Sequence, residues 1–181
     1  MKNIFFTLPI IIVSLIHAQG QPTVHNIKLV ANTKVMDTVN LNQGIFLHDL
    51  SWAWNKQNAC FPKTQQSKFT GKHVFYSGII PKQSEITITV IPKDPTVNLS
   101  IYAYEIGINS NYLVPNLPSC IRCEADYKLS FSKKGKKQGH IRTIKNLVAI
   151  NNPYRIIIGI TGADKLEEAE FILIISTKPR K

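Results

Sequence analysis

Two cysteines separated by two residues are the side chains of this sequence best suited to chemistry. Cys120 and Cys123 form a C-x-x-C pattern. Such a pair can form a structural disulfide, ligate a metal ion or cycle between thiol and disulfide. The pair follows Pro118 and does not open a helix, so the helix dipole that activates a thiol is missing. A structural disulfide is therefore the favoured interpretation, and an exported protein can keep it oxidised.

A third cysteine leaves the disulfide pairing open. Either Cys120 pairs with Cys123 and Cys60 stays apart, or Cys60 pairs with one of the two. The second pairing closes a loop of about 60 residues and stabilises the fold by roughly 4 kcal/mol in the loop-entropy model. A zinc site would need four ligands, and the further donors, Cys60 and His140, stand at no recognised spacing.

Two carboxylates follow the C-x-x-C pattern. Glu124 and Asp126 are two positions apart, so they share a face if the segment is extended. They could begin a calcium site or an acid–base site, or they could be solvated carboxylates that balance nearby lysines. The sequence contains no G-x-S-x-G or H-E-x-x-H motif. We therefore expect no enzyme activity and no cofactor, apart from calcium at these carboxylates.

Lysines dominate the next segment of the chain. Lys133, Lys134, Lys136 and Lys137 surround Gly135, in a chain whose net charge is +11. This composition predicts an exposed hairpin tip that either binds polyanions, such as lipopolysaccharide or acidic glycans, or only keeps the protein soluble. Aromatic residues are few here, which argues against nucleic acid as the partner.

Two tryptophans form the other candidate binding surface. Trp52 and Trp54 would share one face of a strand. Side by side, the two rings could stack on sugar rings, and the alternative is that they pack in the core.

The N-terminus has the pattern of an export signal. Lys2 precedes an apolar stretch from Ile4 to Ile16, and small residues stand at Ala18 and Gly20. We predict a signal peptide over residues 1–20, with cleavage after Gly20 or after Ala18. The apolar run is shorter than the roughly 20 residues that span a bilayer, and no later run is long enough. We expect a secreted, periplasmic or other envelope protein with no transmembrane segment after cleavage.

The remaining chain alternates short β-branched and aromatic runs with turns that contain Pro, Gly or Asn. In the run 85–91, for example, Ile86, Ile88 and Val90 alternate with polar residues, as in a strand with one wet face. The sequence predicts an all-β, antiparallel sandwich or barrel forming a single domain, with an initial hairpin of Val24–Ala31 and Lys34–Val39. The expected core residues are Ile86, Ile88, Val90, Leu99, Ile101, Ile156, Ile158 and Leu173.

Six segments follow one another along the chain in a recognisable order: His73–Gly78, Pro81, Ser84–Val90, Asn98–Tyr104, Asn152–Gly159 and Phe171–Ile175. This order resembles that of the bacterial pre-peptidase C-terminal domain. The resemblance covers about residues 72–177, and we predict the domain over residues 72–181, with the C-x-x-C pattern and basic segment as an insertion at 118–142. Residues 21–71 add N-terminal strands. The insertion is similar to that of secreted proteins from Bacteroidetes-type bacteria.

This resemblance implies a jelly-roll-like β-sandwich that assists the attachment of secreted hydrolases to a surface or substrate, sometimes with calcium. The chain departs from the family because it has no catalytic partner domain and no acidic calcium cluster near the domain start. The leading hypothesis is a non-catalytic exported binding module for a glycan or another anionic envelope component. The alternative is a periplasmic thiol-disulfide or metal-handling protein that uses Cys120 and Cys123.

Overall fold

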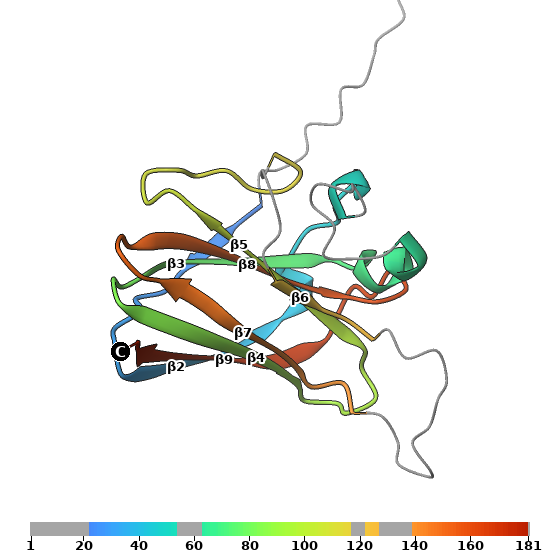
Figure 1. Cartoon of the computed structure of the whole chain (residues 1–181). Coiled ribbons are helices and arrows are strands. Elements are labelled where there is room, and N and C mark those ends of the chain that lie inside the picture. Colours follow the sequence, from blue (N-terminus) through green and yellow to red (C-terminus); the bar gives the residue numbers. More distant parts are fainter. Residues whose placement is uncertain (1–21, 54–62, 117–121, 127–138, 181) are drawn as a thin grey trace, which may run out of the picture.

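The structure is a computed structural model that describes residues 22–53, 63–116, 122–126 and 139–180 (Figure 1). Its regular elements within these ranges are β-strands and three short 3-10 helices. The strands are β1 (Val24–Asn26), β2 (Thr33–Asn40), β3 (His73–Ile80), β4 (Ser84–Pro92), β5 (Leu99–Ile106), β6 (Arg122–Glu124), β7 (Arg142–Ala149), β8 (Tyr154–Gly162) and β9 (Glu170–Pro179). The 3-10 helices are η1 (Leu41–Gln43), η2 (Ser51–Ala53) and η3 (Lys63–Phe69).

These strands form two sheets that pack face to face (Figure 1). The five-stranded sheet has the order β1-β3-β8-β5-β6, and the four-stranded sheet has the order β2-β9-β4-β7. Neighbouring strands are antiparallel in both sheets, except that β1 runs parallel to β3. The antiparallel β-sandwich that the sequence predicts is confirmed.

Side chains alternate between the two faces of each strand, so one set of them lies between the two sheets. In β4 every second residue is buried, so Ile86, Ile88 and Val90 face the other sheet while Thr87 and Thr89 are half-exposed. The apolar run 171–176 is the middle of β9, which lies between β2 and β4.

The inner core is the cluster of buried residues between the two sheets. It is mainly aliphatic, and all eight residues expected in the core are buried in it. Tyr76 is its one tyrosine, and the hydroxyl donates a hydrogen bond of 2.9 Å to Oδ2 of Asp37 on the other sheet. Burial, together with this carboxylate, raises the pKa of the Tyr76 hydroxyl, so the phenol stays protonated and keeps donating.

The initial hairpin predicted from the sequence is wrong. A turn does lie before β2, where Asn32 has a positive φ of 61° and Thr33 Oγ1 donates to the carbonyl oxygen of Val30. This turn joins two different sheets, however, because β1 pairs with β3 and β2 pairs over eight residues with β9. The longer ladder with β9 satisfies more backbone groups than a local hairpin with the three-residue β1 would.

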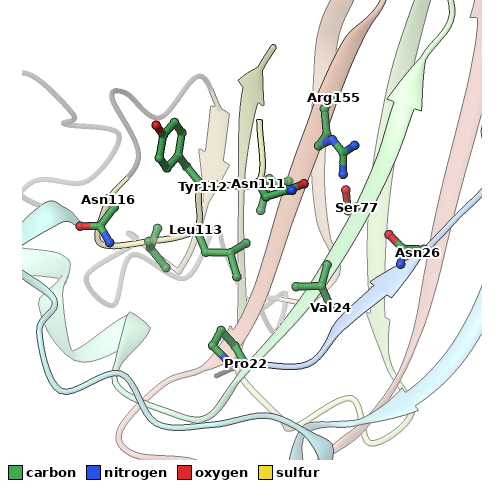
Figure 2. A pocket seen from close by; sticks show the side chains of 11 residues that line it. Pro22, Val24, Asn26, Ser77, Asn111, Tyr112, Leu113, Asn116 and Arg155 are labelled. Carbon is green, nitrogen blue, oxygen red and sulfur yellow. The ribbon is translucent and has the colours of Figure 1, made fainter. Parts of the chain in front are cut away.

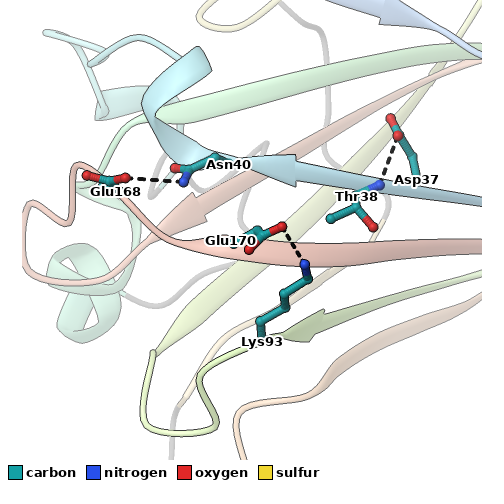
Figure 3. Close-up of polar contacts among 6 residues, drawn as sticks. All are labelled: Asp37, Thr38, Asn40, Lys93, Glu168 and Glu170. Atoms are coloured by element: carbon teal, nitrogen blue, oxygen red, sulfur yellow. Dashed lines mark hydrogen bonds and ion pairs between the residues drawn. The ribbon is translucent and has the colours of Figure 1, made fainter.

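Polar contacts tie the end of the four-stranded sheet to the turn before β9 (Figure 3). The amide of Asn40 donates to Glu168 Oε1 at 3.3 Å, and Lys93 forms an ion pair with Glu170. The backbone N–H of Thr38 donates to its neighbour Asp37 at 2.8 Å. The ion pair is about half-exposed, so it adds little to stability.

Candidate binding site

A second cluster, which we call the outer aromatic cluster, covers the face of the five-stranded sheet that points away from the inner core. Its rings lie close together: the Trp52 centroid is 5.0 Å from that of Tyr102 and 5.9 Å from that of Tyr104. Helices η2 and η3 and the loop after β5 cover these rings. The buried members are Trp52, Phe69, Phe75, Tyr102, Tyr104, Ile106, Val114, Ala125 and Ile157.

A glycine makes room for the central ring of this cluster. Gly159 on β8 lies between Phe75 on β3 and Tyr102 on β5 in the strand register. A Cβ atom at position 159 would lie 2.0 Å from Cζ of Tyr102, so the ring occupies the space that any other side chain would take. The outer aromatic cluster therefore depends on glycine at this position.

A buried histidine holds the same tyrosine in place. His73 Nδ1 lies 2.7 Å from the hydroxyl of Tyr102, and Nε2 lies 3.0 Å from the carbonyl oxygen of Phe69. A carbonyl only accepts, so Nε2 carries the proton and Nδ1 accepts from Tyr102. Burial lowers the pKa of His73 to about 4, so the ring is neutral at pH 7. Neutral His73 thus connects β5 to the end of η3.

The loop after β5, residues 107–116, is fastened to the sheet at several points. Leu113 and Val114 are anchored in the outer aromatic cluster, and the Ser110 N–H donates to Gly107 O at 2.9 Å. Arg155 on β8 donates from Nε and Nη2 to Ile108 O, at 3.1 and 2.8 Å. The loop therefore has a defined shape, although Tyr112 is 62% exposed.

A pocket of about 550 Å³ lies between this loop, β1, β3 and β8 (Figure 2). Its lining combines apolar side chains with amide, hydroxyl and guanidinium groups. A further hollow of about 750 Å³ lies along residues 107–112 and shares Asn111 and Tyr112 with the pocket. The pocket residues are Pro22, Val24, Asn26, Ser77, Asn111, Tyr112, Leu113, Val114, Asn116, Arg155 and Ile157.

The chemistry that these side chains support is hydrogen bonding and ring contact. The amides of Asn26, Asn111 and Asn116 each offer donors and an acceptor, and Arg155 offers donors with a positive charge. The described lining includes no carboxylate, histidine or cysteine that could act as general base or nucleophile. This is a pocket suited to binding a polar ligand, with Tyr112 at its wall.

The structure describes one of the two tryptophan candidates. Trp52 lies on η2 instead of a strand and is 4% exposed, packed against Tyr102 and Tyr104. This placement agrees with the core-packing alternative, because a ring buried on both faces cannot stack on a ligand. Trp54 lies outside the described residues.

The four lysines of the basic segment, Lys133, Lys134, Lys136 and Lys137, also lie outside the described residues. Where the chain is described again, Arg142 begins β7 and is 3% exposed. Its Nε donates to Leu99 O at 2.9 Å, and its Nη2 donates to Asn98 Oδ1 at 2.9 Å. This buried guanidinium fastens the start of β7 to β5, so it has a structural role rather than a place in an exposed basic surface.

The cysteine and carboxylate candidates are placed only in part. Cys123 and Glu124 lie on β6 and Asp126 just beyond it, and Cys123 packs against the outer aromatic cluster. Cys60 and Cys120 lie outside the described residues, so the disulfide pairing stays a prediction. Among the described residues, no three His, Cys, Asp or Glu side chains come together as a metal site would require, and the calcium prediction gains no support.

Sequence reasoning missed the pocket. Asn26, Ser77, Asn111 and Arg155 are spread over four separate segments and belong to no motif. The signal nearest to them is the polar run Asn109–Tyr112 between two apolar strands, since loops that carry amides and an aromatic ring are frequent binding elements.

Among the described residues, no helix has both the length and the hydropathy needed to cross a bilayer. No family model matches the sequence, and no curated protein matches it either.

Solved structures that are similar to this chain include the following two. One is the pre-peptidase C-terminal domain of collagenase from Bacillus anthracis, with 9% identity, 88% of this chain and 99% of that chain covered, and a TM-score of 0.42. The other is PliG of Aeromonas hydrophila, a periplasmic inhibitor of g-type lysozyme. It has 5% identity and a TM-score of 0.40, and the match covers 86% of this chain and 97% of that chain.

Proposed function

We propose that this protein is a non-catalytic, exported binding module whose pocket beside the loop 107–116 binds a glycan. The observation that carries the proposal is the pocket itself, where an exposed tyrosine stands beside three asparagine amides and one arginine. The predicted signal peptide over residues 1–20 supports export.

The lining matches the chemistry of a sugar. A sugar hydroxyl both donates and accepts hydrogen bonds. An asparagine amide can bind it in both ways, because its NH2 group donates and its oxygen accepts. The ring of Tyr112 offers an apolar face with a polar tip, which suits the apolar faces and hydroxyl edges of a pyranose. The pocket volume of about 550 Å³ lies within the range of small-ligand sites. The described lining has no carboxylate, histidine or cysteine to activate a hydroxyl group, which favours binding over turnover.

Titration calorimetry against a panel of neutral and acidic oligosaccharides tests the proposal. Because Tyr112 is exposed, Tyr112→Ala should leave the melting temperature unchanged and weaken binding by roughly tenfold or more, equivalent to about 1.4 kcal/mol. Asn111→Ala should weaken binding in the same direction.

The matched control is Tyr154→Ala, which removes a tyrosine that is 38% exposed and lies outside the pocket lining. Its affinity should equal that of the wild type. Equal losses in Tyr112→Ala and Tyr154→Ala, or no binding to any member of the panel, would contradict the proposal.

A further inference from the structure

One side chain gives the pocket an electrostatic character. Of the eleven described residues that line it, Arg155 is the one that carries a formal charge at pH 7, and the others are apolar, hydroxyl or amide side chains. Arg155 has no ion pair with any described residue. A ligand in this pocket therefore meets one positive charge with no carboxylate of the lining to balance it.

Hydrogen bonds fix the orientation of this guanidinium group. Arg155 Nε and Nη2 both donate to Ile108 O, at 3.1 and 2.8 Å. A guanidinium has five N–H donors in a planar fork. Two of them are used here, so the remaining N–H groups, including both on Nη1, are left for a ligand. Because the group is already held by the loop, binding costs little side-chain entropy.

We propose that the ligand is an acidic sugar and that its carboxylate pairs with Arg155 while its hydroxyls contact Asn26 and Asn111. This inference rests on the proposed function, since it names the class of glycan that the same pocket takes. A carboxylate is planar and carries one negative charge, which one unpaired guanidinium balances. A phosphate monoester carries close to two charges and would leave one unbalanced beside a single arginine.

Charge-matched probes separate a specific contact from attraction to a basic surface. The probes are oligogalacturonate, the same oligomer with its carboxyl groups methyl-esterified, a sulfated oligosaccharide of the same length, and neutral cello-oligosaccharides. The chain carries a net charge of +11, so some non-specific binding of anions is expected. The control variant is Arg180→Gln, which removes the same charge from an exposed position beyond β9, outside the pocket lining.

The experiment is titration calorimetry of each probe against the full mature chain and its Arg155→Gln, Arg155→Lys and Arg180→Gln variants. The wild type should bind oligogalacturonate roughly tenfold more tightly than its methyl ester. Arg155→Gln should remove that preference, Arg155→Lys should keep part of it, and Arg180→Gln should keep all of it. The comparison between acid and ester is made on the wild-type chain, so it stands even if a variant fails to fold.

Three results would overturn the inference. Equal affinity for the acid and its ester, tighter binding of the sulfated oligosaccharide, or equal losses in Arg155→Gln and Arg180→Gln would each exclude carboxylate recognition at Arg155. If cello-oligosaccharides bind in a manner that depends on Tyr112 and not on Arg155, the inference fails and the proposed function survives. If none of the four probes binds, both fail.

Discussion

The inner core and the outer aromatic cluster lie on opposite faces of the same five-stranded sheet, yet they are built differently. Strand β5 contributes to both: Leu99, Ile101 and Ala103 enter the inner core, whereas Tyr102 and Tyr104 enter the outer aromatic cluster. The inner core is closed by a second sheet. The outer aromatic cluster is closed by 3-10 helices and loops, and the pocket lies beside it.

The difference teaches where this fold gains stability and where it gains specificity. Aliphatic side chains between two sheets need only be buried and well packed. The outer aromatic cluster lies against His73, whose two ring nitrogens burial would penalise without partners, and each of these nitrogens has a partner in a defined position. Segments that form hydrogen bonds with such buried groups take a defined shape. A binding pocket requires walls of defined shape.

The largest expected effect concerns the inner core. Ile101→Ala should lower the free energy of unfolding by about 2–5 kcal/mol, because Ile101 is fully buried and truncation leaves a cavity. Ile79→Ala is the matched control, since Ile79 lies on β3 of the same sheet, is 45% exposed and should cost little. Urea unfolding measures both. A cost below about 1 kcal/mol for Ile101→Ala would show that the inner core is not the main source of stability.

Acid should lower the stability of the fold through His73, which holds Tyr102 of the outer aromatic cluster. The pKa of His73 is about 4 in the folded chain, below its ordinary value of 6.5. The unfolded chain therefore takes up a proton between pH 6.5 and 4 while folded His73 stays neutral, so stability falls as the pH is lowered through this window. The loss attributable to His73 reaches about 3 kcal/mol by pH 4 and levels off below that pH.

Urea unfolding of the wild type and His73→Gln at pH 7, 5.5 and 4 measures this contribution. The glutamine variant should be less stable at pH 7, because it replaces a ring with two hydrogen bonds, and its stability should change less with pH. If the free energy of unfolding fell equally with pH in the two proteins, His73 would not be the origin of the acid sensitivity.

Filling the space beneath Tyr102 should have a smaller effect. Gly159→Ala places a Cβ where the ring now lies, so Tyr102 must shift away from His73 and Trp52, at a cost of about 1–3 kcal/mol. Gly107→Ala meets no atom within 4 Å and is the control. Near-UV circular dichroism reports the aromatic packing. An unchanged spectrum and unchanged stability in Gly159→Ala would mean that the ring packing is not specific.

The smallest effect on stability should come from the basic segment. If the segment is the exposed hairpin tip that the sequence predicts, replacing Lys133, Lys134, Lys136 and Lys137 together by Gln should change the free energy of unfolding by less than about 0.5 kcal/mol, because exposed loop charges add little. If the segment binds polyanions, retention on heparin should be abolished and should depend steeply on salt before the change. A loss of retention only in proportion to the charge removed would contradict a specific site there.

The sequence was sufficient to predict the strands that alternate regularly, but not that Trp52 lies on a 3-10 helix. Alternation in the runs 85–91 and 98–106 assigns each residue to a face, and the structure bears out that assignment through Ile88 and Ile101 in the inner core. It was not sufficient to predict which strands pair. Val24–Ala31 and Lys34–Val39 look like neighbours along the chain, but the longer pairing of β2 with β9 joins residues far apart in the sequence.

The sequence by itself therefore determined the β-class and the inner core. The reason is that side chains alternate between the two faces of a strand, so burial of one face between two sheets appears in the sequence as an apolar residue at every second position. Only the tertiary structure decided the binding surface. Strand order brings Asn26, Ser77, Asn111 and Arg155 to one pocket, and the space above Gly159 is filled by a ring from another strand. These are contacts between distant segments, and no local pattern of residue types encodes them.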